Sequence, residues 1–320
     1  MAFVPRKTVF PASVGEVTLG VGENAVTLGG QRVLPLCAFD GALPHAPCVG
    51  AEVTDLGVPA DGLPALQAFY AGCGSIADMA KRDEVMQGVR FLCLRFAGAD
   101  PNGENRSAEE CAGIARQVAD AVSLPLVIMG CKNAEKDAQI FAAVSEALAG
   151  RNVLLLGARE ENYQSVCACA AAHGHRVGAE SSVDINLAKQ LNTLAAQCGT
   201  GVSVMHPGTA AAGYGLDYVV STLERVRDAA LRQSDELLQM PIAVPVCEDA
   251  WSVRETALTE RELPAWGSRE ERGIQMEITT AVTMLAAGAD AVIVRHPETA
   301  KTVSALLDAL LTEGGGNAWQ

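Results

Sequence analysis

Short apolar runs alternate with helical stretches along most of the chain, and this alternation constrains the fold more than any other feature of the sequence. The runs are continuous rather than alternating polar and apolar, which is typical of parallel strands buried on both faces. They occupy residues 49–56, 89–96, 125–129, 152–156, 176–180, 202–205, 242–246 and 289–295. Strand–helix units repeated in this way predict an α/β fold, a closed (β/α)8 barrel of the TIM type.

Helix signals lie between the predicted strands. Ser107 with Glu110, and Ser268 with Glu271, have the spacing of a capping box that opens a helix. The competing fold is a doubly wound open sheet, which usually has fewer units and a glycine-rich loop after its first strand. Residues 57–62 read GVPADG and lack that fingerprint, so the barrel is favoured.

Residues 1–48 differ from the rest of the chain. Glycines punctuate two short β-like runs, at 17–19 and 25–28, and several prolines follow. We predict an N-terminal β-hairpin and extended segment over 1–48, and the barrel over 49–320. A charged stretch at 248–267, after the seventh predicted strand, is a long insertion on the side of the barrel that usually carries function.

Charge and apolar run lengths exclude several functions. The formal net charge is −14 at pH 7, and such a surface repels phosphate backbones and anionic membranes. We therefore expect no nucleic-acid partner and no membrane partner. The start of the sequence lacks the apolar core of a signal peptide, and runs such as 125–129 are far too short to cross a bilayer. A cytoplasmic location is the expectation.

The ten cysteines do not follow metal-binding spacing. They are scattered, and no pair is separated by two residues, so the ligand pattern of zinc and iron–sulfur sites is absent. We interpret them as small buried apolar residues in a reducing compartment. We expect neither a bound metal nor an iron–sulfur cluster in this chain.

Polar residues gather after the predicted strands, where a barrel carries its functional side chains. The candidate binding residues are Asn162, Ser181, Asp184, Asn186, His206, Thr209, Gly213, Tyr214 and His296. Asp184 could equally be only a helix N-cap, and residues 208–215 could be a plain loop or could present backbone amides to a ligand. These residues predict a polar-rimmed mouth for a large polar ligand and name no reaction. No catalytic residue is assigned.

One segment is more specific. Residues 184–192 read DINLAKQLN, which resembles the DxNLAKQLN segment of the acetyl-CoA decarbonylase/synthase delta subunit family, the small subunit of the corrinoid iron–sulfur protein. GYGLDY at 213–218, LQMPI at 238–242 and RHP at 295–297 agree with that family in the same order. The resemblance covers nearly the whole chain.

The resemblance implies a barrel that is not catalytic alone and that pairs with a large subunit carrying an iron–sulfur cluster and a corrinoid-binding domain. The cobalamin-type corrinoid would lie at the interface, against the candidate residues of the barrel mouth. Its cobalt would take a methyl group from a methyltransferase bound to methyl-tetrahydropterin and pass it to an acetyl-CoA synthase centre. The two enzymes would be transient partners. We expect a dry, largely apolar cap over the cobalt, because such a surface offers it no ligand, with polar groups at the rim that hold the amide side chains of the corrin.

The chain also departs from the family pattern. Thr54 stands where a tryptophan is usual, and His206 stands where an aspartate usually precedes proline. His206 could offer cobalt an axial nitrogen, although a hydrogen-bonding role at the rim is favoured. The alternatives are a paralogue that serves another methyl donor, a free-standing pterin-dependent methyltransferase and a scaffold with an empty mouth. In the second alternative, Asn162, Asp184 and Asn186 would meet the pterin ring.

Overall fold

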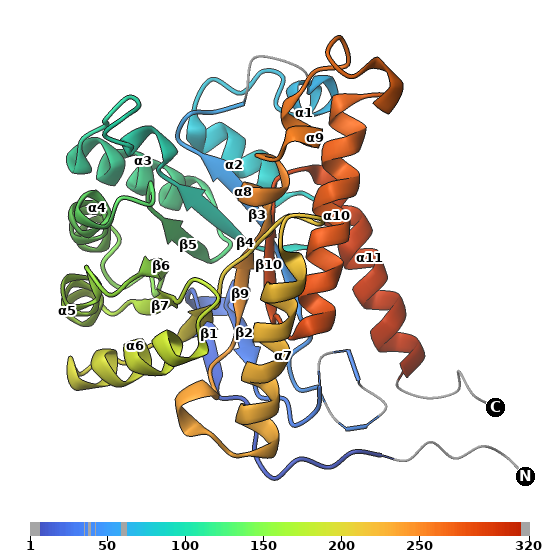
Figure 1. Ribbon diagram of the computed structural model, residues 1–320. Coiled ribbons are helices and arrows are strands. Elements are labelled where there is room, and N and C mark those ends of the chain that lie inside the picture. The colour runs from blue at the N-terminus through green and yellow to red at the C-terminus, as the bar shows by residue number, and fades with distance from the viewer. Residues whose placement is uncertain (1–6, 35, 38–39, 42, 59–62, 315–320) are drawn as a thin grey trace, which may run out of the picture.

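The computed structural model describes residues 7–34, 36–37, 40–41, 43–58 and 63–314, and within them the core is a barrel of parallel strands (Figure 1). The strands follow the order β8-β7-β6-β5-β4-β3-β10-β9. A parallel bridge between Met205 and Ile242 links the two edges of this sheet, so that the barrel closes. The predicted (β/α)8 barrel is confirmed.

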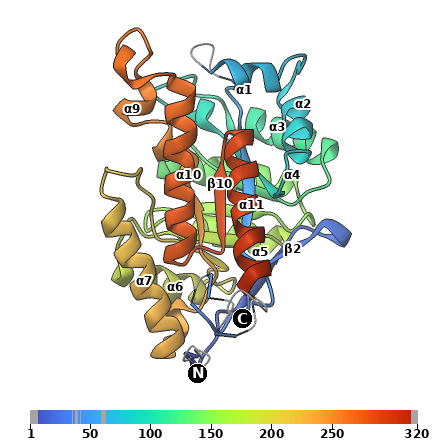
Figure 2. The ribbon, with the colours of Figure 1, turned by 90° about the vertical axis from the view of Figure 1, so that its right-hand side faces the viewer.

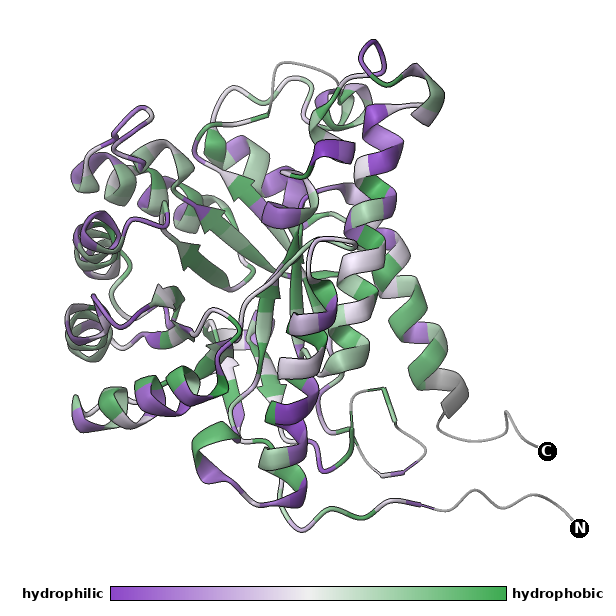
Figure 3. Cartoon of the chain, in the orientation of Figure 1, coloured by the Kyte–Doolittle hydropathy of each residue, from purple (hydrophilic) through white to green (hydrophobic). Residues whose placement is uncertain are grey.

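Each predicted strand is present, with its ends shifted by at most two residues. The bounds are β3 (Cys48–Thr54), β4 (Val89–Arg95), β5 (Leu126–Met129), β6 (Leu154–Ala158), β7 (Arg176–Glu180), β8 (Val204–His206), β9 (Ala243–Pro245) and β10 (Ala291–Val294). Their side chains are almost all buried, as the continuous apolar runs predict (Figure 3). The shifts occur at the strand ends, where apolar residues such as Leu56 continue into turns.

Helices pack around the barrel and follow its strands in turn. They are α1 (Pro64–Phe69), α2 (Ile76–Glu84), α3 (Ala108–Ala121), α4 (Ala134–Ala147), α5 (Tyr163–His173), α6 (Ile185–Gln197), α7 (Leu216–Arg232), α10 (Arg269–Ala287) and α11 (Pro297–Gly314). Figure 2 shows β10 between α10 and α11, and the two helices also contact each other. The capping box is confirmed at α3, where Ser107 Oγ accepts from the Glu110 amide at 3.2 Å and the Glu110 carboxylate accepts from the Ser107 amide at 2.8 Å.

The predicted N-terminal hairpin covers one end of the barrel. It consists of β1 (Glu16–Leu19) and β2 (Val26–Gly29), which pair antiparallel. Asn152, just before β6, donates from Nδ2 to the carbonyls of Thr18 at 2.9 Å and Gly20 at 3.0 Å, so the hairpin lies against the amino ends of the barrel strands. Residues 1–6, 35, 38–39 and 42 of the predicted extension lie outside the described residues.

The carboxyl ends of the strands lie at the opposite end, which we call the mouth. The insertion after β9 folds there into α8 (Val246–Ala250), α9 (Arg254–Ala257) and a 3-10 turn, Pro264–Trp266. Figure 1 shows this insertion at the far end of the barrel from the hairpin. Residues 59–62, in the loop after β3, lie outside the described residues. Among the helices that the structure describes, none combines the length and the apolar character needed to cross a membrane.

Candidate functional site

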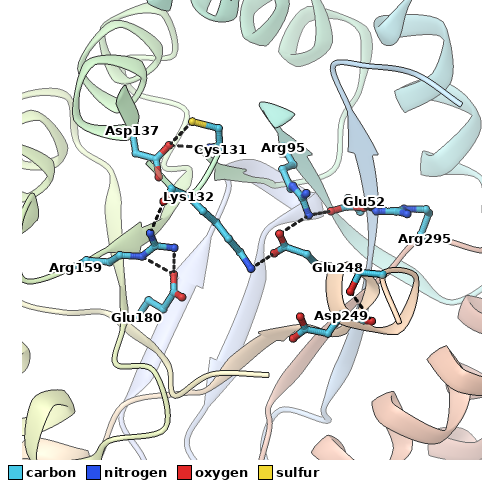
Figure 4. Close-up of polar contacts among 11 residues, drawn as sticks. Glu52, Arg95, Cys131, Lys132, Asp137, Arg159, Glu180, Glu248, Asp249 and Arg295 are labelled. Atoms are coloured by element: carbon cyan, nitrogen blue, oxygen red, sulfur yellow. Dashed lines mark hydrogen bonds and ion pairs between the residues drawn. The ribbon is translucent and has the colours of Figure 1, made fainter. Parts of the chain in front are cut away.

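The carboxylate of Glu52 is buried at the mouth of the barrel. Glu52, near the end of β3, accepts from Arg295 Nε at 2.9 Å and Nη2 at 2.7 Å, and from Arg95 Nη1 at 3.3 Å (Figure 4). Its side chain is 0% exposed. A buried carboxylate is tolerated only with charged partners of this kind. Burial alone would raise the pKa of Glu52, but the two arginines outweigh it and hold the pKa below its usual value.

A second carboxylate extends this contact across the barrel. Glu248, in the insertion after β9, lies 3.2 Å from Arg95 Nη1 and 2.9 Å from Lys132 Nζ. Lys132 follows β5, on another side of the mouth. Arg295, Glu52, Arg95, Glu248 and Lys132 therefore form one continuous chain of ion pairs, which we call the mouth network (Figure 4).

A separate ion pair lies beside Lys132. Glu180, at the end of β7, accepts from Arg159 Nε at 3.0 Å and Nη2 at 2.7 Å. Arg159 also donates to the backbone carbonyl of Lys132 at 2.8 Å, which joins this pair to the mouth network. Burial raises the pKa of Glu180, but the neighbouring cations outweigh it and the pKa lies below its usual value. Glu52 and Glu180 are therefore both ionised at neutral pH.

His206 is the last residue of β8 and lies near the charged groups of Glu180 and Lys132. The residue is 3% exposed, and its Nδ1 atom has no hydrogen-bond partner among the described residues. Burial lowers the pKa of His206 below 6.5, against the opposing effect of Glu180. The imidazole is therefore neutral at pH 7 and contributes no charge to the mouth.

Asn162 and Asp184 hold loops and helix ends. Asn162 is buried; its Oδ1 accepts from the Arg159 amide at 2.8 Å, and its Nδ2 donates to the Ala134 carbonyl at 3.2 Å. Asp184 caps α6, because its Oδ1 accepts from the amides of Asn186 at 2.7 Å and Leu187 at 3.2 Å. The capping interpretation of Asp184 is thus confirmed. Both capping bonds use Oδ1, so the other oxygen of the exposed Asp184 carboxylate is not used in the cap.

The other candidates are divided between surface and interior. Asn186, Gly213 and Tyr214 are exposed, and the Tyr214 hydroxyl donates to Glu255 at 2.6 Å. Ser181 is buried, and its amide donates to the His206 carbonyl at 3.1 Å. The Thr209 side chain lies beside Asp249, whose pKa is raised, mainly by burial.

His296 lies away from the mouth network. It is 1% exposed, it stacks on the ring of Trp251, and its Nε2 lies 3.3 Å from Glu270 in α10. Its Nδ1 accepts from the Glu298 amide at 3.2 Å. These contacts tie the end of β10 to α10 and to the insertion, so the structure gives His296 a packing role.

The largely apolar mouth expected from the sequence is wrong for the described residues, because the mouth network crosses it. Arg95, Glu180 and Arg295 each stand at or beside the carboxyl end of a predicted strand, and that position could have identified them. Glu52 gives a weaker signal, since it lies within its run. Nowhere in the described ranges do three or more His, Cys, Asp or Glu residues gather as a metal site would require.

The expectation that the ten cysteines are buried holds for half of them. Five are buried, four are partly buried and one is exposed; the buried ones are Cys48, Cys93, Cys111, Cys167 and Cys247, and the exposed one is Cys198. Burial raises the pKa of the Cys48 thiol to about 12, so this thiol stays protonated and unreactive.

Comparison with known proteins gives consistent results. The family model described as "CO dehydrogenase/acetyl-CoA synthase delta subunit" matches residues 16–309. The chain is similar to the acetyl-CoA decarbonylase/synthase complex subunit delta of Archaeoglobus fulgidus, at 31% identity over 98% of this chain and 71% of that protein. The subunit of the same name from Methanocaldococcus jannaschii is 30% identical over 97% of this chain and 77% of that protein.

Solved structures with a similar fold are dihydropteroate synthases. The enzyme from Thermus thermophilus in complex with 6HMPPP has a TM-score of 0.52 and 15% identity, and the match covers 92% of this chain and 100% of that one. The 7,8-dihydropteroate synthase from Vibrio fischeri has a TM-score of 0.57 and 11% identity, with 93% and 98% covered. At such identities the likeness shows the shared barrel fold.

Proposed function

This chain belongs to the CO dehydrogenase/acetyl-CoA synthase delta subunit family, and from that premise we propose that it is the small subunit of a corrinoid iron–sulfur methyl carrier. The observation that carries the proposal is the extent of the family match. Residues 16–309 include every barrel strand and the whole mouth network. The chain would cover a corrinoid at its interface with a large subunit that holds the iron–sulfur cluster.

The mouth fits a corrinoid as a covering surface rather than as an enclosing pocket. The mouth network occupies the centre, and the cavity beside it has a volume of about 530 Å³, too small for a corrin ring with its side chains. The macrocycle would therefore lie across the rim. A bound corrinoid would supply the cobalt that carries the methyl group.

Exposed polar groups of the rim suit the carboxamide side chains of a corrin. The Lys132 side chain is 46% exposed and offers a donor. Asn186, in the first turn of α6, and Tyr214, in the loop before α7, are also exposed. Asp184 keeps an exposed carboxylate beside them. His206 is buried below this surface, which favours a role within the protein over an axial bond to cobalt. Under this proposal, a methyl-tetrahydropterin-dependent methyltransferase and an acetyl-CoA synthase centre approach the same face in turn.

Co-expression with the large subunit tests this proposal. The two chains are separated by size-exclusion chromatography, and each peak is examined by visible absorption and cobalt assay. We expect one heterodimer peak that carries one corrinoid. A colourless chain that elutes alone in the presence of a folded large subunit would contradict the proposal. Methyl-pterin binding would then be measured, because a free-standing methyltransferase barrel would be the better account.

A further inference from the structure

A cavity of about 530 Å³ opens beside the mouth network, between the ends of β3 and β4 and the helices α1 and α2. We propose that this cavity binds a small organic carboxylate with an apolar body. The inference goes beyond the function proposed above, because it needs neither the corrinoid nor the large subunit. Its volume is within the range of small-molecule sites.

The accessible charge in the cavity is positive, although a carboxylate stands at its floor. Glu52 is 0% exposed, whereas the side chains of Arg95 and Arg295 are 16% and 20% exposed. All three line the cavity. A ligand entering it would therefore meet guanidinium edges and would not meet the Glu52 oxygens.

Both guanidinium groups retain hydrogen-bonding capacity. Arg295 uses Nε and Nη2 for Glu52, and its Nη1 group has no acceptor among the described residues. Arg95 uses only Nη1, which contacts both Glu52 and Glu248. A carboxylate suits the free edge of Arg295, because guanidinium and carboxylate groups form short, charge-assisted hydrogen bonds.

The nearby helix end does not compete for the ligand. The amides of Ala65 and Leu66 at the start of α1 donate to Glu270 at 2.9 and 2.8 Å. Those donors are satisfied within the protein, so recognition of an anion falls to the arginines.

The walls select for an apolar body. Leu56, Val58, Leu66 and Met79 line the cavity above the arginines. Burying apolar atoms against these side chains favours binding through the hydrophobic effect. An inorganic anion could use only the guanidinium edge, so it should bind more weakly than an arylalkyl carboxylate.

Calorimetric titration of the isolated chain with 3-phenylpropionate tests the proposal. The controls are 3-phenylpropanamide, which has the same body without the charge, and sodium chloride at equal ionic strength. We expect saturable binding of the acid, with the amide at least about tenfold weaker because it lacks the charge-assisted bond. Equal binding of acid and amide, or no saturable binding of either, would overturn the proposal and leave the carrier function untouched.

Two sets of variants locate the site. Thr54 lines the cavity, so Thr54→Trp should fill part of it and abolish binding, whereas Thr302→Trp, on the exposed face of α11, should bind normally. Glu52→Gln removes the internal anion while keeping the shape of the side chain. Binding of the acid should then tighten by about tenfold, because Arg295 loses its carboxylate partner and Arg95 keeps only Glu248.

The double variant Glu52→Gln/Arg295→Gln removes the ion pair as a unit and should bind the acid more weakly than Glu52→Gln does, because the guanidinium of Arg295 is lost. Circular dichroism checks that each variant is folded. Unchanged binding in Thr54→Trp, or weaker binding in a folded Glu52→Gln variant, would contradict the assignment of the site.

Discussion

Lys132 is the most exposed member of the mouth network. A substitution there should therefore affect ligand binding with little effect on the stability of the fold. Its side chain is 46% exposed, whereas its partner Glu248 is 15% exposed. Lys132→Ala should cost at most about 1 kcal/mol of unfolding free energy, as for other exposed ion pairs. It should nevertheless lower the cobalt content of the purified heterodimer, because an exposed donor at the rim is lost.

The matched control is Lys136→Ala. Lys136 is partly exposed on α4 and donates to Asn105 at 2.9 Å, outside the mouth network. Cobalt content should stay at the wild-type level in this variant. If both variants retain cobalt equally, Lys132 does not contact the corrinoid.

The burial of His206 leads us to predict that the stability of the folded chain depends on pH. Its folded-state pKa lies below the ordinary value of 6.5, mainly because it is buried. As pH falls through 6.5, the unfolded chain takes up a proton before the folded chain does, so folding loses free energy down to the folded-state pKa. Replacing the imidazole by an amide removes this contribution.

Urea unfolding of the wild type and of His206→Gln at pH 7.5 and pH 5.5 measures the effect. The free energy of unfolding should fall less on acidification in the variant than in the wild type. Parallel pH dependences in the two proteins would show that His206 does not titrate in this way.

Residue roles were predictable only where a local pattern defines them. The sequence left two roles for Asp184, a helix N-cap or a contact to a ligand. Its hydrogen bonds from the amides of Asn186 and Leu187 show that it caps the helix. The pairing of Glu52 with Arg295 joins residues 243 positions apart. It depends on the closure of the barrel, which no local pattern contains, and for that reason an apolar mouth was expected.

At the scale of elements, burial explains why the strands were found. Runs such as residues 154–156 are apolar throughout because both faces of the barrel strands are covered. The hairpin was also predictable from its glycines. Its docking against the loop before β6 was not, since that contact runs through the Asn152 side chain to distant backbone carbonyls.

Two glycines of the hairpin give a matched test of its packing against residue 15. Both have positive φ, +90° at Gly29 and +72° at Gly22. A Cβ at Gly29 would lie 1.9 Å from the Gly15 carbonyl oxygen, whereas a Cβ at Gly22 would meet nothing within 4 Å. Gly22→Ala should therefore cost only the backbone strain, about 1 kcal/mol.

Gly29→Ala must also displace the neighbouring chain, so we expect it to cost at least about 2 kcal/mol more. Midpoints of urea unfolding, compared between the two variants, measure the difference. Equal midpoints would mean that the hairpin is not packed against residue 15 as described.

At the scale of the whole molecule, the two ends of the barrel are unlike. The hairpin covers the amino ends of the strands, whereas the carboxyl ends carry the mouth network, the cavity beside it and the insertion containing α8 and α9 (Figures 1 and 4). Apolar packing continues from the hairpin into the core through Leu19, Val26 and Leu28. The mouth is the end at which we propose that a ligand or a partner binds.

Hydrogen–deuterium exchange of the chain, alone and in the proposed heterodimer with the large corrinoid subunit, shows whether the partner binds at the mouth. We expect complex formation to slow exchange in the segments that border the mouth, around Lys132, Asp184 and Tyr214, and to leave the hairpin at residues 16–29 unchanged. Protection confined to the hairpin end, or absent from the mouth segments in a formed complex, would contradict it.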